Sequence, residues 1–176
     1  KRLLPKRLKT KPRLPILFVH VPKTAGTSFR KAASQSKKIV HVLCDYGKDN
    51  ATTTSEINDA AHYSNDTLSI ELVLNNHENY ILTGHFPVDR YKRFFYPYEI
   101  GIFIRDPVDR VLSNYYPKQR NEQFTGSIEE FIQTNAADNL QLKRFGDLAP
   151  QYFGFIGISD KYDESIALVN ALYSID

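Results

Sequence analysis

A segment composed of one lysine followed by small and hydroxyl-bearing residues has the composition of a phosphate-binding loop. Its members are Lys23, Thr24, Ala25, Gly26, Thr27 and Ser28. The glycine would let the backbone approach an anion, the hydroxyls can donate hydrogen bonds, and a following helix would present free N–H groups. The lysine adds a full positive charge. Because this lysine precedes the glycine, the segment does not match the nucleoside-triphosphatase pattern G-x-x-x-x-G-K-[ST].

A second candidate for binding an anion lies later in the chain. Arg105 ends an apolar run, and Ser113 follows eight residues later in a predicted helix. The guanidinium group offers a rigid fork of donors to a phosphate, and a serine about two turns into the helix can reach the same anion. The alternative is that Arg105 forms an ion pair with Asp106 or Asp109 at the end of its strand.

Histidines supply the candidate general base. Thr83-Gly84 precede His85 and Phe86-Pro87 follow it, so His85 is expected at the end of a strand. There it could take a proton from a substrate, or it could be a structural histidine. His20 lies inside an apolar strand, where a hydrogen-bonded histidine in the core or behind the site is favoured over a catalyst. His62 is expected on the surface.

These residues need a scaffold that brings distant segments together. Short apolar runs predict strands at 16–21, 38–43, 80–85, 100–105 and 153–159. Helical spacing and capping signals predict helices at 29–34, 68–76, 106–116, 127–134 and 162–173. Strands that alternate with helices indicate an α/β class, here a single P-loop-like domain with a mainly parallel sheet flanked by helices. Ligands bind beyond the C-terminal ends of such strands, where all the candidates are expected.

Three local features of these elements are also predicted. Thr27 or Ser28 should cap the first helix. The helix over 106–116 should end before Pro117, because proline has no N–H to continue the hydrogen-bonding pattern. Residues 45–65 are rich in Thr, Asn, Asp and Ser and predict a long surface loop with too little apolar content for the core.

Composition and charge divide the chain into a tail and a body. The 176 residues carry a net charge of +3, but the first 13 contain seven Lys or Arg and no acid, so the remainder is mildly acidic. Residues 1–14 are therefore expected to be a basic tail or linker and 15–176 one domain. Anion sites in the body must come from local placement of a few groups. The tail could hold a polyanion or be a solvated terminus.

The single cysteine and the distribution of apolar residues indicate the cellular compartment in which the protein is expected. Cys44 alone excludes an intrachain disulfide and a cysteine cluster for a metal, and it favours a reducing compartment. No apolar run approaches the roughly 18 residues of a membrane span. A cytoplasmic location is therefore expected, with the Golgi lumen as the alternative if an anchor upstream has been removed. The chain contains no methionine, so an upstream segment is expected to be missing.

Two motifs resemble those of sulfotransferases that use 3′-phosphoadenosine 5′-phosphosulfate (PAPS). Val-Pro-Lys-Thr-Ala-Gly-Thr-Ser-Phe closely resembles the 5′-phosphosulfate loop of the family that includes the heparan and chondroitin uronosyl 2-O-sulfotransferases. Ile-Arg-Asp-Pro-Val-Asp-Arg-Val-Leu-Ser-Asn-Tyr-Tyr resembles its 3′-phosphate motif, which implies that Arg105 and Ser113 hold the 3′-phosphate.

Weaker motif similarities extend the resemblance to other parts of the chain. Gly-His85-Phe resembles the strand-end histidine of the uronosyl 2-O-sulfotransferases, and residues 139–141 and 155–165 resemble later signatures. Together the likenesses cover about 15–172. Because the family usually continues beyond its last helix, Asp176 is expected to be a premature end.

The resemblance implies transfer of a sulfuryl group from PAPS to a hydroxyl, with a carbohydrate as the expected acceptor and adenosine 3′,5′-bisphosphate as product. Lys23 would neutralise charge on the bridging oxygen as its bond breaks, and His85 would take the proton from the acceptor. No metal is expected, because a sulfuryl group carries less negative charge than a phosphoryl group and the sequence offers no metal cluster. No nucleic acid partner is expected, and the oligomeric state stays open.

The acceptor and two rival functions remain to be distinguished. Arg90, Lys92 and Arg93 lie among aromatic residues and would suit an acidic glycan, or their run could be a solvated loop with its aromatics in the core. The polar segment 45–65 and the basic tail could also touch an acceptor. One rival function is a nucleotide kinase or ATPase, which would bind ATP with Mg²⁺. The other is a non-catalytic domain that binds polyanions through the tail.

Overall fold

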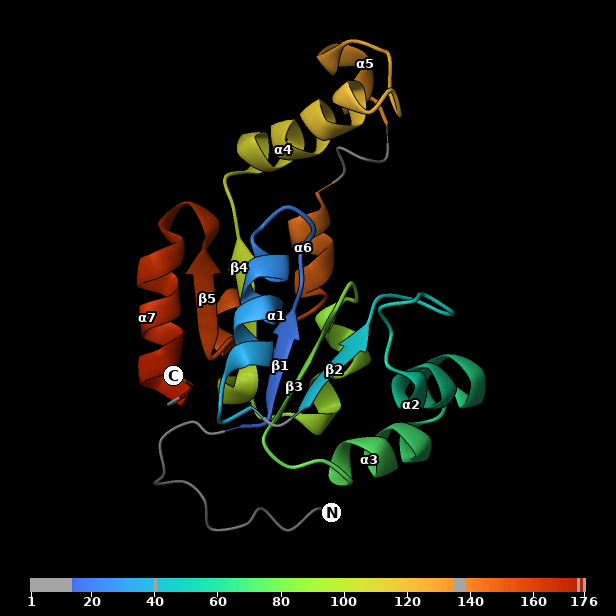
Figure 1. Cartoon of the computed structure of the whole chain (residues 1–176), viewed down its shortest axis with the longest axis vertical. Helices are drawn as coiled ribbons and strands as arrows, with labels where there is room; N and C mark the ends of the chain where they lie inside the picture. The colour runs from blue at the N-terminus through green and yellow to red at the C-terminus, as the bar shows by residue number, and fades with distance from the viewer. Residues whose placement is uncertain (1–13, 40, 135–138, 174, 176) are drawn as a thin grey trace.

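A five-stranded parallel sheet forms the centre of the molecule (Figure 1). The structure is a computed structural model that describes residues 14–39, 41–134, 139–173 and 175. The strand order is β2-β3-β1-β4-β5, and every pairing is parallel. The strands are β1 (Ile16–Val19), β2 (His41–Asp45), β3 (Tyr80–Gly84), β4 (Ile100–Ile104) and β5 (Phe155–Ile158). The predicted α/β class with a parallel sheet is confirmed, and all five predicted strands are present with shifted ends.

Helices cover both faces of this sheet. The longer ones are α1 (Gly26–Gln35), α3 (Thr67–Asn75), α4 (Pro107–Arg120) and α7 (Tyr162–Tyr173). The shorter ones are α2 (Ser55–Asn58), the π-helix η1 (Asp59–Ser64), α5 (Ile128–Ile132) and α6 (Leu140–Phe145). Single 3-10 turns are η2 (Val88–Arg90), η3 (Lys92–Phe94), η4 (Pro97–Glu99), η6 (Pro150–Tyr152) and η7 (Ser159–Lys161).

Helices α1 and α7 pack on one face of the sheet. Side chains alternate along a strand, so Ile16 and Phe18 of β1 point to this face. The ring of Phe18 stacks on Phe29 of α1 with a centroid distance of 3.9 Å, and Val169 of α7 belongs to the same buried cluster. Burial of a side chain such as Phe18 contributes roughly 1.5–3 kcal/mol to folding. Leu14, which the sequence assigns to the tail, packs against this cluster, whereas residues 1–13 lie outside the described residues.

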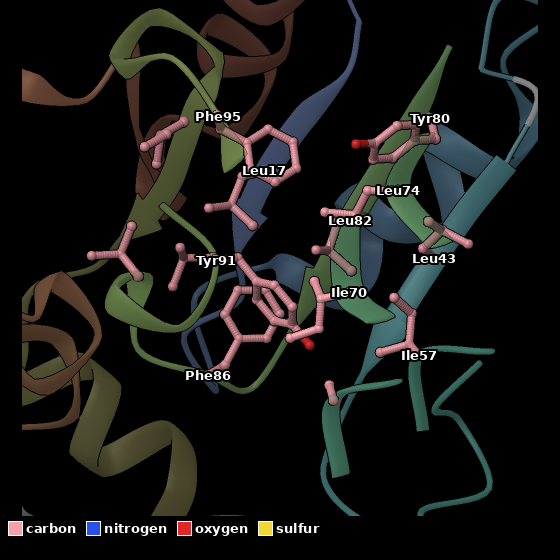
Figure 2. Packing of buried hydrophobic residues seen from close by; sticks show 14 of the residues in the cluster. Leu17, Leu43, Ile57, Ile70, Leu74, Tyr80, Leu82, Phe86, Tyr91 and Phe95 are labelled. Atoms are coloured by element: carbon pink, nitrogen blue, oxygen red, sulfur yellow. The ribbon is translucent and has the colours of Figure 1, made fainter. Parts of the chain in front are cut away.

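The opposite face buries a larger cluster under α2, η1, α3 and the turns that follow β3 (Figure 2). Ile57, Ala60 and Ala61 are all buried in it. The prediction that 45–65 is a surface loop is therefore wrong. These three apolar residues recur at helical spacing, so a mostly polar segment still presents one apolar stripe to the sheet.

Two predicted helix ends differ from the structure. Helix α1 begins at Gly26, and its N-cap residue Ala25 makes no side-chain capping bond, so the predicted cap at Thr27 or Ser28 is wrong. Helix α4 continues through Pro117 to Arg120. A proline inside a helix loses one hydrogen bond, and here that loss does not end the helix. Helix α5 begins with a capping box, in which Ser127 and Glu130 exchange both bonds.

Helices α4 and α5 form a projecting arm. Figure 1 shows α4 leading away from the end of β4, with α5 at its far end. The arm has its own aromatic cluster, in which the Phe131 ring lies 5.3 Å from Tyr115 and 5.1 Å from Phe124. Tyr115 also donates a hydrogen bond to the carbonyl of Gly126 (3.1 Å). The arm therefore carries packing that is separate from the two clusters on the sheet.

Candidate functional site

The strand order brings three candidate segments to one edge of the sheet. Val19 of β1 pairs with Gly84 of β3 on one side and with Ile102 of β4 on the other. Because the three strands are parallel and adjacent, the segments after their C-terminal ends are neighbours. The loop 23–28 therefore lies between His85, which follows β3, and Arg105, which follows β4.

The loop between β1 and α1 has an unusual backbone. Lys23 (φ 71°) and Ala25 (φ 64°) both adopt the left-handed conformation, which is rare for residues other than glycine and is found most often at functional sites. Alternation of this kind turns successive N–H groups toward a common concavity that suits an anion. The first N–H groups of α1 also have no acceptor within the helix. The backbone of the loop thus offers a cluster of donors at one point.

The side chains of the loop divide into two groups. Thr24 is fully buried, and its hydroxyl donates a hydrogen bond to the carbonyl of Val21 (2.8 Å), so this side chain shapes the loop. Lys23, Thr27 and Ser28 are exposed. Among the described residues, no carboxylate lies within ion-pair distance of Lys23, so its charge is available to a ligand.

His20 connects this loop to His85. The two imidazole rings lie 4.6 Å apart, and the ring of Tyr46 lies 4.6 Å from His85. His20 is buried, and its Nδ1 is 2.8 Å from the hydroxyl of Tyr46. A β-carbon added at Gly26 would come within 2.0 Å of the His20 ring, so the close approach of His20 requires glycine at this position. One contact chain therefore runs from the phosphate-loop candidate through His20 to the candidate base.

Both histidines are held neutral. Burial, followed by the charges of Arg144 and Arg30, lowers the pKa of His85 from 6.5 to about 4. Burial, followed by the charges of His85, Arg30 and Arg144, lowers the pKa of His20 to about 3. One side of His85 packs on His20 and Tyr46 although the residue as a whole is exposed. At neutral pH the imidazole of His85 is therefore in the form that can accept a proton.

Asp45, which sequence reasoning missed, supports His85 through its backbone and carries a buried carboxylate. The Asp45 side chain is only 2% exposed, and its backbone carbonyl accepts a hydrogen bond from the N–H of His85 (2.9 Å). Its Oδ1 lies 2.7 Å from Nε2 of His62, while its Oδ2 accepts a bond from Tyr91 (2.7 Å) and lies 3.2 Å from Nε of Arg90. The prediction that His62 is a surface residue is wrong, because this contact holds it against the end of β2.

The Asp45 carboxylate is ionised in the folded protein. Burial alone would raise its pKa, but the hydrogen bonds from His62 and Tyr91 and the charge of Arg90 outweigh burial and lower the pKa below 3.8. The signal in the sequence was an acid directly after an apolar strand. Its partners come from segments far along the chain and could not be read from spacing.

We expect Asp45→Ala to lower the free energy of unfolding by about 3–5 kcal/mol, because it leaves the Arg90 charge and the Tyr91 hydroxyl without their acceptor. Because the folded pKa is depressed, the stabilisation is present above the unfolded value of 3.8 and is lost as the pH falls through the folded value. Urea unfolding at pH 7 measures the difference. Asp49→Ala, at an exposed acid nearby, serves as the control and should change stability much less. Equal effects of the two substitutions would contradict this interpretation.

Arg105 is positioned by residues that the sequence did not indicate. Its backbone N–H and carbonyl both bond the side chain of Gln141 on α6 (2.8 Å each), and its Nε lies 3.4 Å from Oδ1 of Asp160. The expected alternative partner Asp106 instead caps α4 through bonds from backbone N–H groups. Ser113 is partly exposed in α4. The strand-end arginine thus has a fixed backbone and an ion pair with an exposed acid.

The basic run 90–98 is occupied by contacts within the protein. Tyr91 is fully buried and Phe95 nearly so. The basic side chains bond Asp45 and the carbonyl of Ala61 (Arg90), Asp89 and Asp147 (Lys92), and Thr67 (Arg93). Of the two interpretations of this run, the structure therefore favours the loop with aromatics in the core, and the aromatics that are buried are Tyr91 and Phe95.

Other features lie away from this edge. A cavity of about 480 Å³ lies at the opposite edge of the sheet, where Tyr80 begins β3 and Glu99 precedes β4. In the described ranges, no group of three or more His, Cys, Asp or Glu side chains is arranged to hold a metal ion. Within the part of the chain that the structure describes, no helix combines the length and apolar character needed to cross a bilayer.

Comparisons with known proteins bear on the family and on the fold of the chain. A family model described as the sulfotransferase family matches residues 6–168. The fold is similar to the crystal structure of a sulfotransferase from Alicyclobacillus acidocaldarius, with a TM-score of 0.50 and 17% sequence identity. That match covers 93% of this chain and 82% of the other. A search of curated proteins gave no match.

Proposed function

The chain belongs to the sulfotransferase family, and on that basis we propose that it transfers a sulfuryl group from PAPS to a hydroxyl group of a carbohydrate. The observation that carries this proposal is the meeting of the loop 23–28, His85 and Arg105 at three neighbouring strand ends. Each segment supplies one kind of group that the reaction needs: anion donors, a base and a second cation.

The loop fits the 5′-phosphosulfate end of the donor. The left-handed conformations of Lys23 and Ala25 gather backbone donors, and α1 begins directly behind them. Thr27 and Ser28 are exposed and can add hydroxyl donors, while Thr24 and Gly26 keep the loop in shape through Val21 and His20. The donor set is cationic and neutral, which suits a phosphosulfate.

Arg105 and Ser113 would hold the 3′-phosphate. The backbone of Arg105 is fixed by Gln141, which holds the base of its side chain in place at the strand end. Its present ion pair with Asp160 is partly exposed and can be exchanged for a phosphate. Ser113 follows on the helix that begins at this strand end.

When bound, the donor supplies an activated sulfuryl group. The ammonium group of Lys23 would stabilise negative charge at the leaving oxygen, with backbone N–H groups of the loop in support. Nε2 or Nδ1 of His85 would take the proton from the acceptor hydroxyl, since the ring is neutral at pH 7. Asp45 would position His85 through the bond to its backbone N–H.

We expect Arg105→Ala to weaken binding of adenosine 3′,5′-bisphosphate by roughly 10–100-fold, because a charge-assisted bond to phosphate contributes about 1.5–3 kcal/mol. Isothermal titration without metal measures this change. Arg120→Ala removes an equal charge from the exposed last turn of α4 and is the matched control, with no effect expected.

The same titration separates the proposed function from its rivals. Wild-type protein should bind adenosine 3′,5′-bisphosphate much more tightly than ATP with Mg²⁺ or heparin. Preference for ATP with Mg²⁺ would indicate a kinase or ATPase, and preference for heparin alone would indicate a polyanion-binding domain. An Arg105→Ala protein that folds and binds the bisphosphate normally would refute the 3′-phosphate assignment.

A further inference from the structure

Helix α6 spans the candidate site from one strand end to the next. Near its start, Gln141 bonds both backbone groups of Arg105, at the end of β4. Just after its end, Gly146 lies against Asp89 so closely that a β-carbon would come within 2.0 Å of the carboxylate, and the N–H of Asp147 bonds the same group (3.3 Å). Asp89 belongs to η2, four residues after His85. The helix therefore runs between the two ends of the site, with β1 and its loop in between.

Arg144 lies on the face of α6 that points into the site. It follows Gln141 by three residues, and residues so spaced share one face of a helix. Gln141 is buried and faces Arg105, so Arg144 is directed inward beside it. The side chain is partly buried, and its Nε is buried with no hydrogen-bond partner in the part of the chain that the structure describes.

No carboxylate among the described residues lies within ion-pair distance of Arg144. A cation that is removed from water and left without a counter-charge destabilises the folded state. Burial accordingly lowers the pKa of Arg144. Such an arrangement is suited to an anion that arrives from outside the protein.

The charge of Arg144 acts where the phosphate loop and the candidate base meet. It is the strongest charge on His85 and also reaches His20, whose ring touches Gly26 of the loop. Arg30 is the other cation that acts on these rings, but its guanidinium lies 5.2 Å from the centroid of the Tyr46 ring, and its charge also acts on the Cys44 thiol. Of the two arginines that act on these rings, Arg144 is the one without such contacts among the described residues.

We propose that Arg144 binds the oxygens of the donor's sulfuryl group and holds that group between the loop and His85. This inference rests on the proposed function. In-line transfer requires the sulfuryl sulfur to lie between the leaving oxygen at Lys23 and the hydroxyl at His85. During transfer, the bond from the leaving oxygen to sulfur breaks with its electron pair kept by the nucleotide, and the acceptor oxygen bonds sulfur as its proton passes to His85. A guanidinium group at this position can donate to two sulfuryl oxygens without moving.

The test compares two nucleotides that differ only by the sulfuryl group. Arg144→Gln should weaken binding of PAPS by roughly 10-fold or more, the loss expected for a charge-assisted bond, and leave the affinity for adenosine 3′,5′-bisphosphate within about twofold. Arg144→Lys should recover part of the PAPS affinity, because it keeps the charge and loses the fork. Lys143→Gln removes a charge from the next, exposed position and should change neither affinity.

A second measurement needs no nucleotide. By NMR, His85 of the free Arg144→Gln protein should titrate at higher pH than in the wild type, since the largest charge that opposes its protonation is gone. An unchanged His85 titration in a folded variant would refute the placement of Arg144.

Three outcomes of these nucleotide-binding and kinetic measurements would overturn the proposal. Equal loss of affinity for both nucleotides would make Arg144 a residue for folding or nucleotide binding in general. Unchanged PAPS affinity with a raised KM for the acceptor would assign Arg144 to an anionic group of the acceptor. Failure of the wild-type protein to bind either nucleotide would refute the proposed function itself. The titration of the wild-type protein alone shows this outcome, so it is distinguishable from failure of the Arg144 proposal.

Discussion

Replacing His85 with alanine should lower turnover by roughly 10²–10⁴-fold, the range for loss of a general base, while affinity for adenosine 3′,5′-bisphosphate stays nearly unchanged. The expectation follows from the position of His85 at the end of β3, beside His20 and one strand away from the loop 23–28. Steady-state rates with labelled PAPS and a panel of sugar acceptors measure turnover, and titration calorimetry measures nucleotide affinity.

The pH dependence gives this prediction a sharper form. From the sequence alone, kcat/KM would be expected to fall as the pH drops through the ordinary histidine pKa of ~6.5. In the structure, burial and the charges of Arg144 and Arg30 lower the pKa of His85 to about 4. Because only neutral imidazole accepts a proton, kcat/KM should be flat through neutral pH and fall as the pH drops through about 4. The corresponding fall in kcat should occur at higher pH, because the anions bound in the substrate complex favour the imidazolium form of His85.

A matched histidine at the far edge of the sheet provides the control. His77 contacts Glu56 there, and His77→Ala should leave turnover within a few-fold of wild type. If His85→Ala behaves like this control, the base lies elsewhere. The next candidates for the base would be His20, Asp89 and Glu99. His20 and Asp89 lie near His85, whereas Glu99 sits at the opposite edge of the sheet, where it caps the turn before β4.

Lys23→Ala should reduce turnover by roughly 10²–10³-fold, comparable to the loss of one group that stabilises charge in a transition state. Binding of adenosine 3′,5′-bisphosphate should weaken much less, since the charge of Lys23 matters most as the leaving oxygen becomes negative. Rapid-quench measurement of a single turnover isolates the chemical step from nucleotide release.

Lys31→Ala is the control for this substitution, because it removes an exposed charge from α1, the helix that follows the loop. It should alter neither rate nor affinity. A loss of affinity as large as the loss of rate in Lys23→Ala would show that Lys23 only anchors the nucleotide.

The sheet and the edge that carries the site were predictable because they depend on short-range patterns. Runs such as 16–19 and 100–104 are apolar throughout, as expected for parallel strands covered on both faces. Once the strands are parallel, residues that follow them must share an edge. This is why His85, Arg105 and the loop 23–28 could be placed together from the order of residues alone.

What the sequence did not reveal depends on contacts between distant segments. The partners of Asp45 and the ion pair of Arg105 with Asp160 join residues that no spacing relates. Helix α6 was missed because six residues are too few for a clear period. Its ends did carry signals: Asn139 caps Leu142, and Gly146 ends the helix with φ 56°. The lowered pKa of His85 depends first on burial and then on the charge of Arg144 in this helix, and neither could be predicted from the sequence.

The projecting arm of α4 and α5 has a consequence for dynamics. A unit whose packing is separate from the main core can open on its own, at a lower free energy than unfolding of the whole domain. Arg105 directly follows β4 on the body of the protein, while Ser113 lies on the arm. A nucleotide held by both residues would tie the arm to the body, so amide hydrogen exchange in α4 should slow when adenosine 3′,5′-bisphosphate binds, whereas exchange in the central strand β1 should stay almost unchanged.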